Sequence, residues 1–174
     1  ASSSAYGNPQ KLPSVEEHHT NPISPYAAQK FYGEVSCKMF SQVYGIETVS
    51  LRYFNVYGER QNLGGAYATV VGIFIKQCLD KTPMTINGSG NNRRDYTYVG
   101  DVVNANLLAM TSPLVGSGEV INIGSGKNLS TNEVAEMIGD KKVHQDAVIE
   151  PKRTLADIKK AKDLLGWEPK VRLE

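Results

Sequence analysis

An α/β fold is predicted by three observations in the sequence. Short β-branched and aromatic runs alternate with segments of helical periodicity along the whole chain. Glycine and proline stand between these segments, where the chain has to turn. The 174 residues, 40% of them hydrophobic, suffice for one domain with a sizeable core.

The first third of the chain is expected to hold a helix between two extended segments. Residues 1–24 carry several prolines and glycines and predict a strand end followed by a loop. Helical periodicity then runs over 25–44, where Pro25 suits a first turn and Gly45 a stop. The β-branched run at 46–56 predicts a buried strand.

The middle of the chain continues the alternation. A loop is expected over 57–65, and the apolar pattern of 66–81 predicts a helix. Residues 84–99 predict a hairpin, with two short strands around a Gly/Asn turn. A helix over 100–111 and a strand with a turn over 119–126 follow.

Two further helices are expected near the C-terminus, each with a hydroxyl side chain at its start. Ser130 or Thr131 is the expected cap of a helix over 132–139. Thr154 is the expected cap of a helix over 155–166.

Composition excludes several classes of protein. A formal net charge of +1 argues against nucleic acid or an anionic membrane as the main partner. The sequence shows neither an apolar run of about 18 residues nor a signal-peptide pattern. Cys37 and Cys78 fit no disulfide or ligand spacing and are expected to be reduced core thiols. Because both thiols are expected to be reduced, we expect a cytoplasmic protein. No histidine spacing recurs, so no metal site is predicted.

A tyrosine and a lysine are four residues apart on the first predicted helix. Tyr26 and Lys30 therefore share one helix face. A neighbouring ammonium favours the phenolate form, which a general base needs. Such pairs also occur by chance on solvated faces. The pair becomes specific here because it lies between "SSSAYG" and "LRYFNVYG".

Several segments in order resemble a known family. They are "SSSAYG", "SPYAAQK", "LRYFNVYGERQ", "GAYATVVGIFI", "TINGSGNNRRDYTYVGDVVNANLLA", "NIGSG" and "LADIKKAKDLLGWEP". Together they are similar to the extended short-chain dehydrogenase/reductases, and among these to the NAD-dependent nucleotide-sugar 4-epimerases and their dehydratase and decarboxylase relatives. The resemblance implies NAD as cofactor and a UDP-sugar as substrate.

The resemblance also implies a fold and its division. The chain would be the C-terminal part of a Rossmann-type doubly wound parallel sheet plus a small α/β substrate-binding lobe. Rossmann strands and helices are expected in 1–66 and 94–112, and the lobe in 67–93 and 113–174. The Gly-rich NAD-binding half is expected to be absent, and the turn 124–128 does not replace it, since it lacks the third glycine.

Three residues are implied as catalytic: Ser2, Tyr26 and Lys30. Ser3 is the second choice for the serine that meets the reacting sugar hydroxyl. Three serines stand where the dehydratases carry a Thr-Asp-Glu triplet, so epimerisation is favoured over dehydration.

Binding residues are implied in the same way. Tyr53 and Phe54, with Tyr26 and Lys30, would contact the nicotinamide end of NAD. The remaining substrate-binding positions would meet the diphosphate, uridine or ribose, and are Asn55, Thr69, Val70, Thr85, Asn87, Arg94 and Arg153.

One departure from the family concerns the second phosphate arginine. The usual R-x-G-D stretch is missing from "VIEPKRTLADIKKA", and Arg153 or Lys152 would replace its arginine.

Two alternatives to an epimerase stay open. One is a related UDP-sugar decarboxylase or dehydratase. The other is a catalytically inactive fragment that binds substrate and dimerises. A homodimer or higher oligomer is expected in either case, because the helix with Tyr26 belongs to a dimer-forming bundle in the family.

Overall fold

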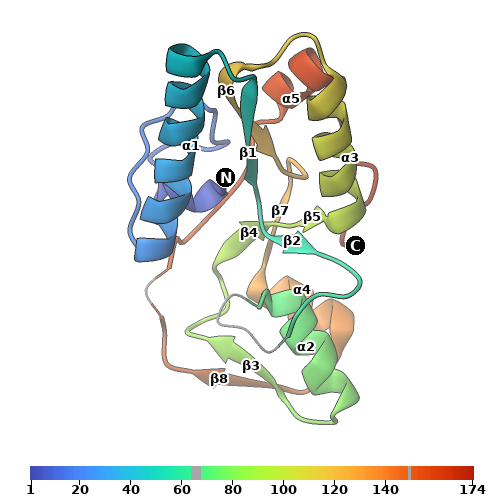
Figure 1. The fold of residues 1–174 in the computed structure, drawn as a ribbon. Helices are drawn as coiled ribbons and strands as arrows, with labels where there is room; N and C mark the ends of the chain where they lie inside the picture. Colours follow the sequence, from blue (N-terminus) through green and yellow to red (C-terminus); the bar gives the residue numbers. More distant parts are fainter. Residues whose placement is uncertain (64–67, 149) are drawn as a thin grey trace.

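The computed structural model describes residues 1–63, 68–148 and 150–174. Helices and strands alternate along the chain, as Figure 1 shows. In chain order the elements are η1 (Ser3–Tyr6), α1 (Pro25–Tyr44), β1 (Thr48–Tyr53), β2 (Val56–Tyr57), α2 (Val70–Leu79), β3 (Met84–Asn87), β4 (Arg93–Asp95), β5 (Thr97–Tyr98), α3 (Val99–Thr111), β6 (Ser117–Ile123), β7 (Asn128–Ser130), α4 (Thr131–Ile138), β8 (Lys142–Gln145) and α5 (Lys159–Leu165).

One part of the molecule, the β1/β6 layer, consists of the parallel pair β1–β6 with η1, α1, α3 and α5. α1 covers one face of the strand pair, and α3 and α5 cover the other (Figure 1). The core of this layer gathers Leu51, Val102, Ile121 and Trp167, all buried. The indole of Trp167 is also anchored, because its Nε1 donates to the Asp101 carbonyl at 2.9 Å.

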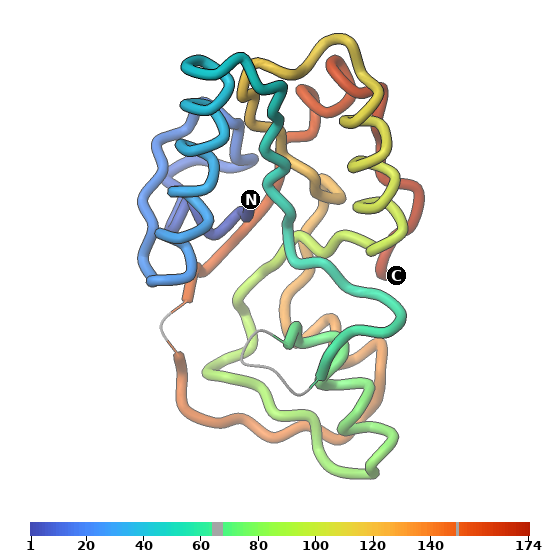
Figure 2. The backbone as a smooth tube through the Cα atoms, viewed as in Figure 1, coloured from blue at the N-terminus to red at the C-terminus, as the bar shows by residue number. Residues whose placement is uncertain are grey.

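The other part, the α2/β3 lobe, consists of α2, α4 and the parallel pair β3–β8. Its own core contains Phe74, Met84, Ile86 and Val134. The chain passes between the two parts several times, as the tube in Figure 2 shows. The short strands β2, β4, β5 and β7 lie on these passages, β2 beside β5 and β4 beside β7.

The predicted α/β fold is confirmed, and its local signals are visible at the helix ends. α1 begins after Ser24, whose side chain accepts a bond from the Ala27 amide, and Pro25 takes its first turn. Gly45 ends it at φ 67°, a left-handed conformation that glycine adopts without strain. Of the two caps proposed for α4, Ser130 holds the position and forms a capping box with Glu133.

The hairpin expected over 84–99 is wrong. β3 pairs with β8 and β4 pairs with β7, so the two strands separate after the Gly/Asn turn. The pattern missed β8 because all four of its residues are exposed and polarity does not alternate along it.

Two smaller expectations also fail. Thr154 does not cap α5, which begins only at Lys159; the Thr154 hydroxyl accepts a bond from the Asp95 amide instead. Cys78 is exposed, and Cys37 is half-buried, so neither is a core thiol, although both are free. The helix expected over 66–81 is seen from Val70 to Leu79, while residues 64–67 lie outside the described residues.

The expected division into a Rossmann part and a substrate lobe differs from the packing. Residues 113–174 are expected in the lobe, but β6 pairs with β1 and α5 packs on β6. The reason is the apolar face of α5, whose Ala161 and Leu165 complete the core around Trp167. Within this range, α4 and β8 belong to the α2/β3 lobe.

A buried ion pair joins α1 to β1. The Arg52 guanidinium donates to both carboxylate oxygens of Glu34, from Nε at 2.8 Å and from Nη2 at 2.6 Å. The two side chains are only 4% and 3% exposed. Burial works against the charged form, yet the bonds to Glu34 hold the pKa of Arg52 above its ordinary value.

The pair continues into a polar network that reaches the N-terminal segment. The Arg52 guanidinium lies over the ring of Tyr6, 4.5 Å from its centroid. The Tyr6 hydroxyl donates to Asn122 on β6 at 2.8 Å. Asn122 in turn donates to the Ser14 carbonyl at 2.9 Å. Burial raises the pKa of Tyr6 to about 12, so it stays a neutral donor at physiological pH.

Glu34→Ala is expected to lower the free energy of unfolding by about 3–5 kcal/mol, because it leaves the Arg52 charge buried without a partner. Urea titration followed by far-UV circular dichroism measures the loss. The matched control is Asp163→Ala, which removes the partner of Lys159 in an exposed pair on α5 and should cost less than about 1 kcal/mol. Equal losses in the two variants would contradict the dependence of the fold on this pair.

Candidate active site

A cleft of about 1190 Å³ lies between the β1/β6 layer and the α2/β3 lobe. One wall is formed by η1, the first turn of α1 and the residues after β1. The opposite wall is formed by the start of α2, by β3 and β4, and by residues around 145–154. Ten of the thirteen residues predicted for the site line the cleft: Ser2, Ser3, Tyr26, Tyr53, Asn55, Thr69, Val70, Thr85, Asn87 and Arg94.

Ser2 lies on the first wall, beside the end of β1. It forms a parallel bridge with Tyr53, and it is 9% exposed. Its Oγ accepts bonds from the Ser4 amide at 3.2 Å and the Ser4 hydroxyl at 3.0 Å. The serine run is therefore ordered, with Ser3 and Ser4 in the same wall of the cleft.

Tyr26 enters this wall from the first turn of α1. Its side chain is half-buried and lines the cleft. Lys30 follows one turn later, with Nζ 5.4 Å from the centre of the Tyr26 ring. Lys30 itself is exposed and lies outside the lining.

The residues after β1 divide between cleft and core. The Tyr53 hydroxyl donates to Asn106 at 2.9 Å, and its side chain lines the cleft. Asn55 also lines the cleft, where its Nδ2 donates to the Asp95 carbonyl at 3.3 Å. Phe54 is 1% exposed and packs with Tyr6 and Ala156, so its ring does not reach the cleft. The nicotinamide contact expected of Phe54 is therefore not formed from this position. Successive strand residues point to opposite sides, which explains the difference.

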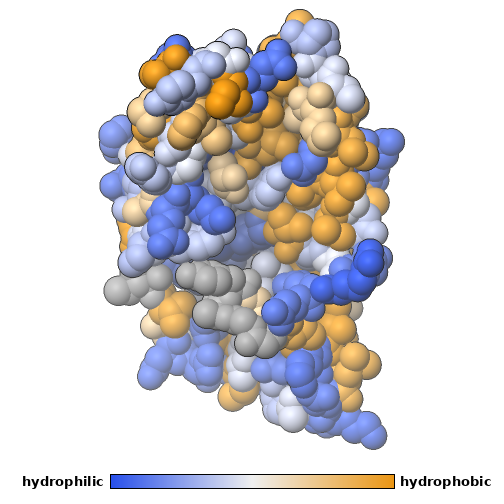
Figure 3. All heavy atoms as spheres, viewed as in Figure 1, coloured by the Kyte–Doolittle hydropathy of each residue, from blue (hydrophilic) through white to orange (hydrophobic). Residues whose placement is uncertain are grey.

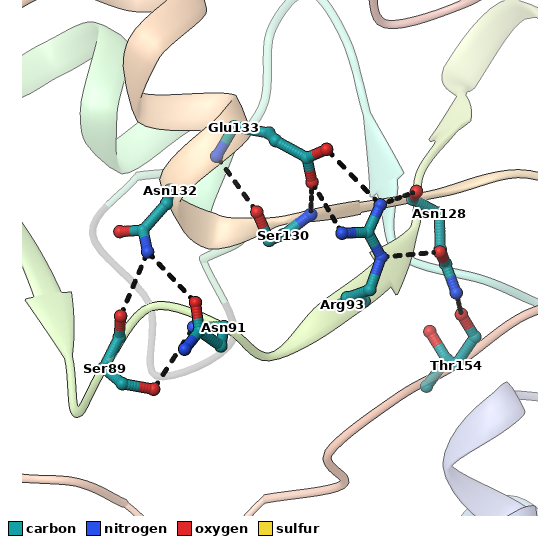
Figure 4. A network of polar contacts seen from close by, with 8 residues as sticks. All are labelled: Ser89, Asn91, Arg93, Asn128, Ser130, Asn132, Glu133 and Thr154. Carbon is teal, nitrogen blue, oxygen red and sulfur yellow. Dashed lines mark hydrogen bonds and ion pairs between the residues drawn. The ribbon is translucent and has the colours of Figure 1, made fainter.

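The same alternation separates two adjacent arginines on β4. Arg94 lines the cleft, whereas Arg93 turns away into a polar network with Asn128 and Glu133 (Figure 4). Arg93 is half-buried, and it ties β4 to β7 and to the start of α4 with bonds of 2.9 Å to both partners.

Arg94 has two partners of its own. Its Nη2 lies 2.8 Å from the Glu150 carboxylate, and its Nη1 donates to the Arg93 carbonyl at 3.1 Å. Its side chain is 12% exposed. Charge-assisted bonds of this kind are what an arginine offers to phosphate or carboxylate groups.

The positions predicted for the nucleoside end also line the cleft. Thr69 precedes α2 and accepts a bond from Gln61 at 2.6 Å, and Val70 follows it in the first turn. Thr85 accepts from Gln77 at 2.9 Å. Asn87 accepts from Gln145 on β8. The three polar side chains among these positions are therefore held by hydrogen bonds within the chain.

Some lining residues were missed by reasoning from sequence. They are Glu59, Arg60, Gln145 and Glu150. Glu59 and Arg60 belong to the quoted "GERQ" segment, which was a usable signal. Gln145 and Glu150 sit in a polar stretch without periodicity, and nothing in their spacing indicates a cleft.

Arg153, the expected replacement for the second phosphate arginine, is exposed and lies outside the cleft lining. Its backbone forms a bridge with Arg93, while Pro151 and Thr154 on either side of it line the cleft.

The turn 124–128 is occupied by a buried carboxylate. Asp95 accepts from the Ser125 amide at 2.7 Å, the Gly126 amide at 3.1 Å and the Ala156 amide at 3.0 Å. Burial raises the pKa of Asp95, although these bonds work in the opposite direction. The amides that could bind a phosphate already donate to Asp95, so this turn does not fit a cofactor pyrophosphate.

Within the described residues, no helix is long and apolar enough to cross a bilayer. No group of three or more His, Cys, Asp or Glu side chains in this part of the chain is arranged to hold a metal ion.

Comparison with known proteins gives consistent matches. Residues 1–124 match the model of the NAD dependent epimerase/dehydratase family. A UDP-glucose 4-epimerase of Mycolicibacterium smegmatis is 36% identical over 98% of this chain and 56% of its own length.

Two solved structures share the fold at comparable identity. UDP-glucose 4-epimerase of Thermotoga maritima with UDP-glucose is 40% identical with a TM-score of 0.91, covering 99% of this chain and 58% of that one. UDP-glucuronic acid 4-epimerase of Bacillus cereus with UDP-glucuronic acid and NAD is 36% identical with a TM-score of 0.91, covering 99% and 56%.

The chain thus spans little more than half the length of the relatives it matches. The family match covers most of the chain, and the relatives align over nearly all of it. The 174 residues therefore belong to the NAD-dependent epimerase/dehydratase family.

Proposed function

We propose that the chain is the catalytic and substrate-binding part of a UDP-sugar 4-epimerase acting on a UDP-hexose or its N-acetyl form. The observation that carries the proposal is the convergence of Ser2, Tyr26 and Tyr53 on one wall of a cleft whose other wall holds Arg94. A hydroxyl, a phenol and an aromatic group thus face a guanidinium across one space. This arrangement suits a sugar joined to a diphosphate.

Tyr26 acts as the general base in this proposal. As a phenolate it takes the proton from the sugar 4-hydroxyl, directly or through the Ser2 hydroxyl, and Lys30 Nζ lies 5.4 Å from the centre of its ring. Bound NAD supplies the acceptor and donor of the C4 hydride. Inversion at C4 would require the 4-keto sugar to present its other face to the bound cofactor.

The cofactor fits this chain at one end. Tyr26 and Tyr53 offer an aromatic, hydrogen-bonding corner for a nicotinamide ribose, with the Lys30 ammonium beside it. The described residues offer no comparable cradle for the pyrophosphate, since the amides of Ser125 and Gly126 are bound by Asp95. We therefore assign pyrophosphate binding to a Gly-rich half that this chain does not contain.

Substrate binding is assigned to the opposite wall. Arg94 on that wall, with Asn55 after β1 on the first wall, holds the diphosphate, while Thr69, Val70, Thr85 and Asn87 border the nucleoside. A second diphosphate contact from Arg153 stays a prediction, because it requires the exposed segment at 152–153 to turn toward the cleft.

We also propose a homo-oligomer formed through the outer face of α1. Only Ala27 and Glu34 are buried among its described residues. Val35, Met39 and Val43 recur every four residues and are 49%, 48% and 64% exposed. A comparable hydrophobic surface on α3, seen at the right of Figure 3, contains Val103, Leu107 and Met110. Apolar stripes of this kind are typical of surfaces that become covered.

Arg94→Met is expected to weaken binding of UDP-glucose to the 174-residue chain about tenfold or more, because a charge-assisted bond to the diphosphate is lost. Isothermal titration calorimetry measures the dissociation constant. Arg172→Met removes an equal charge from an exposed position and should leave binding unchanged.

The same titration with NAD addresses the alternative of a binding fragment. UDP-glucose binding without NAD binding favours a chain that holds substrate and needs another half for chemistry. Tight binding of NAD by this chain would contradict our placement of the pyrophosphate site.

Tyr26→Phe is expected to lower kcat about 10²–10⁴-fold, since the base is removed while the ring remains. The assay follows UDP-glucose to UDP-galactose conversion by the chain joined to an NAD-binding half. Tyr32→Phe, on the same helix and 71% exposed, is the matched control. Activity within tenfold of the parent would refute the role, and release of carbon dioxide from UDP-glucuronate would favour the decarboxylase instead.

Met39→Glu is expected to shift the chain from oligomer to monomer, because the charge would be buried without a partner at the α1 interface. Sedimentation velocity measures the change. Leu107→Glu places the same charge on the α3 stripe and should leave the oligomer intact. The opposite result would move the interface to α3.

A further inference from the structure

The guanidinium that our proposed function assigns to the diphosphate already has an anion beside it. Arg94 Nη2 lies 2.8 Å from Glu150 Oε2. The other carboxylate oxygen, Oε1, accepts from Asn92 Nδ2 at 2.7 Å. One carboxylate therefore uses two donors, a guanidinium and an amide, that converge from β4 and the residue before it.

The acidic and basic side chains that line the cleft are equal in number among the described residues. The charged side chains among the described lining residues are Glu59, Arg60, Arg94 and Glu150, so their formal charges cancel. An entering diphosphate would meet no net positive charge from these groups. It has to replace an anion rather than fill an empty positive site.

Arg94 does not depend on Glu150 for its position. Its Nη1 donates to the Arg93 carbonyl at 3.1 Å, and its side chain is 12% exposed while that of Glu150 is 35% exposed. The arginine is thus anchored by its own strand, and the carboxylate is the more accessible partner. Glu150 can leave without releasing the guanidinium.

We propose that Glu150 is an internal anion that competes with the ligand's phosphate group for Arg94 and Asn92. The affinity of the cleft for a diphosphate then depends on how much more strongly Arg94 and Asn92 bind the phosphate than the Glu150 carboxylate. This inference rests on the proposed function for the identity of the ligand, but the competition itself concerns any phosphate anion.

The test compares Glu150→Gln with the parent 174-residue chain by calorimetry, using UDP and inorganic pyrophosphate as probes. Glutamine keeps an oxygen for Asn92 and removes the charge that holds Arg94. Both probes are expected to bind about fivefold more tightly or better. Glu150→Ser, which removes charge and reach together, should give a similar gain and guards against a folding effect of glutamine.

Glu59→Gln is the matched control, because it removes an equal charge from the same lining without a contact to Arg94. Tighter binding in E150Q with E59Q unchanged supports the proposal. Tighter pyrophosphate binding without any UDP binding also supports it, and contradicts the nucleotide part of the proposed function.

Other outcomes overturn the inference. Equal or weaker UDP binding in E150Q makes Glu150 neutral or a positioning residue and leaves the proposed function standing. An equal gain in E59Q shows that overall charge acts rather than competition. Failure of every variant to bind either probe removes the inference together with the proposed function.

Discussion

The buried ion pair between Arg52 and Glu34 is the constraint on which the candidate site depends. It fastens α1 to β1, and these two elements carry Tyr26 and Tyr53. Glu34 lies eight residues after Tyr26 and four after Lys30, so the three share a helix face. Rotation of α1 would have to break a charged pair with almost no access to water.

The opposite wall of the cleft has a comparable anchor. Asp95 receives amide bonds from Ser125, Gly126 and Ala156, which brings β4, the turn after β6 and the segment before α5 together. Arg93 adds bonds from the same strand to Asn128 and Glu133. Each wall is thus fixed by a charged group whose partners come from distant parts of the chain. The cleft lies between these two fixed walls.

Sequence reasoning succeeded where the signal is local. Pro25 and Gly45 bound α1 as expected, and Ser130 caps α4, because each acts within one turn of its own position. It failed where pairing joins residues far apart. β3 and β8 are more than fifty residues from each other, and the turn between β3 and β4 looks like a hairpin turn in isolation. Glu150 reaches Arg94 only through the folded chain, and no periodicity indicates the contact.

The alternation along β4 has a consequence for how the cleft could change. Arg93 and Arg94 are chemically identical neighbours, and the three residue pairs between β4 and β7 decide which of them faces the ligand. If β4 shifted by one residue, Arg93 would face the cleft and Arg94 would take the structural position, with no change in amino-acid composition. The register of β4 against β7 therefore decides which positive charge faces the cleft. An insertion in the Gly/Asn turn before β4 is tolerated only if it leaves this register unchanged.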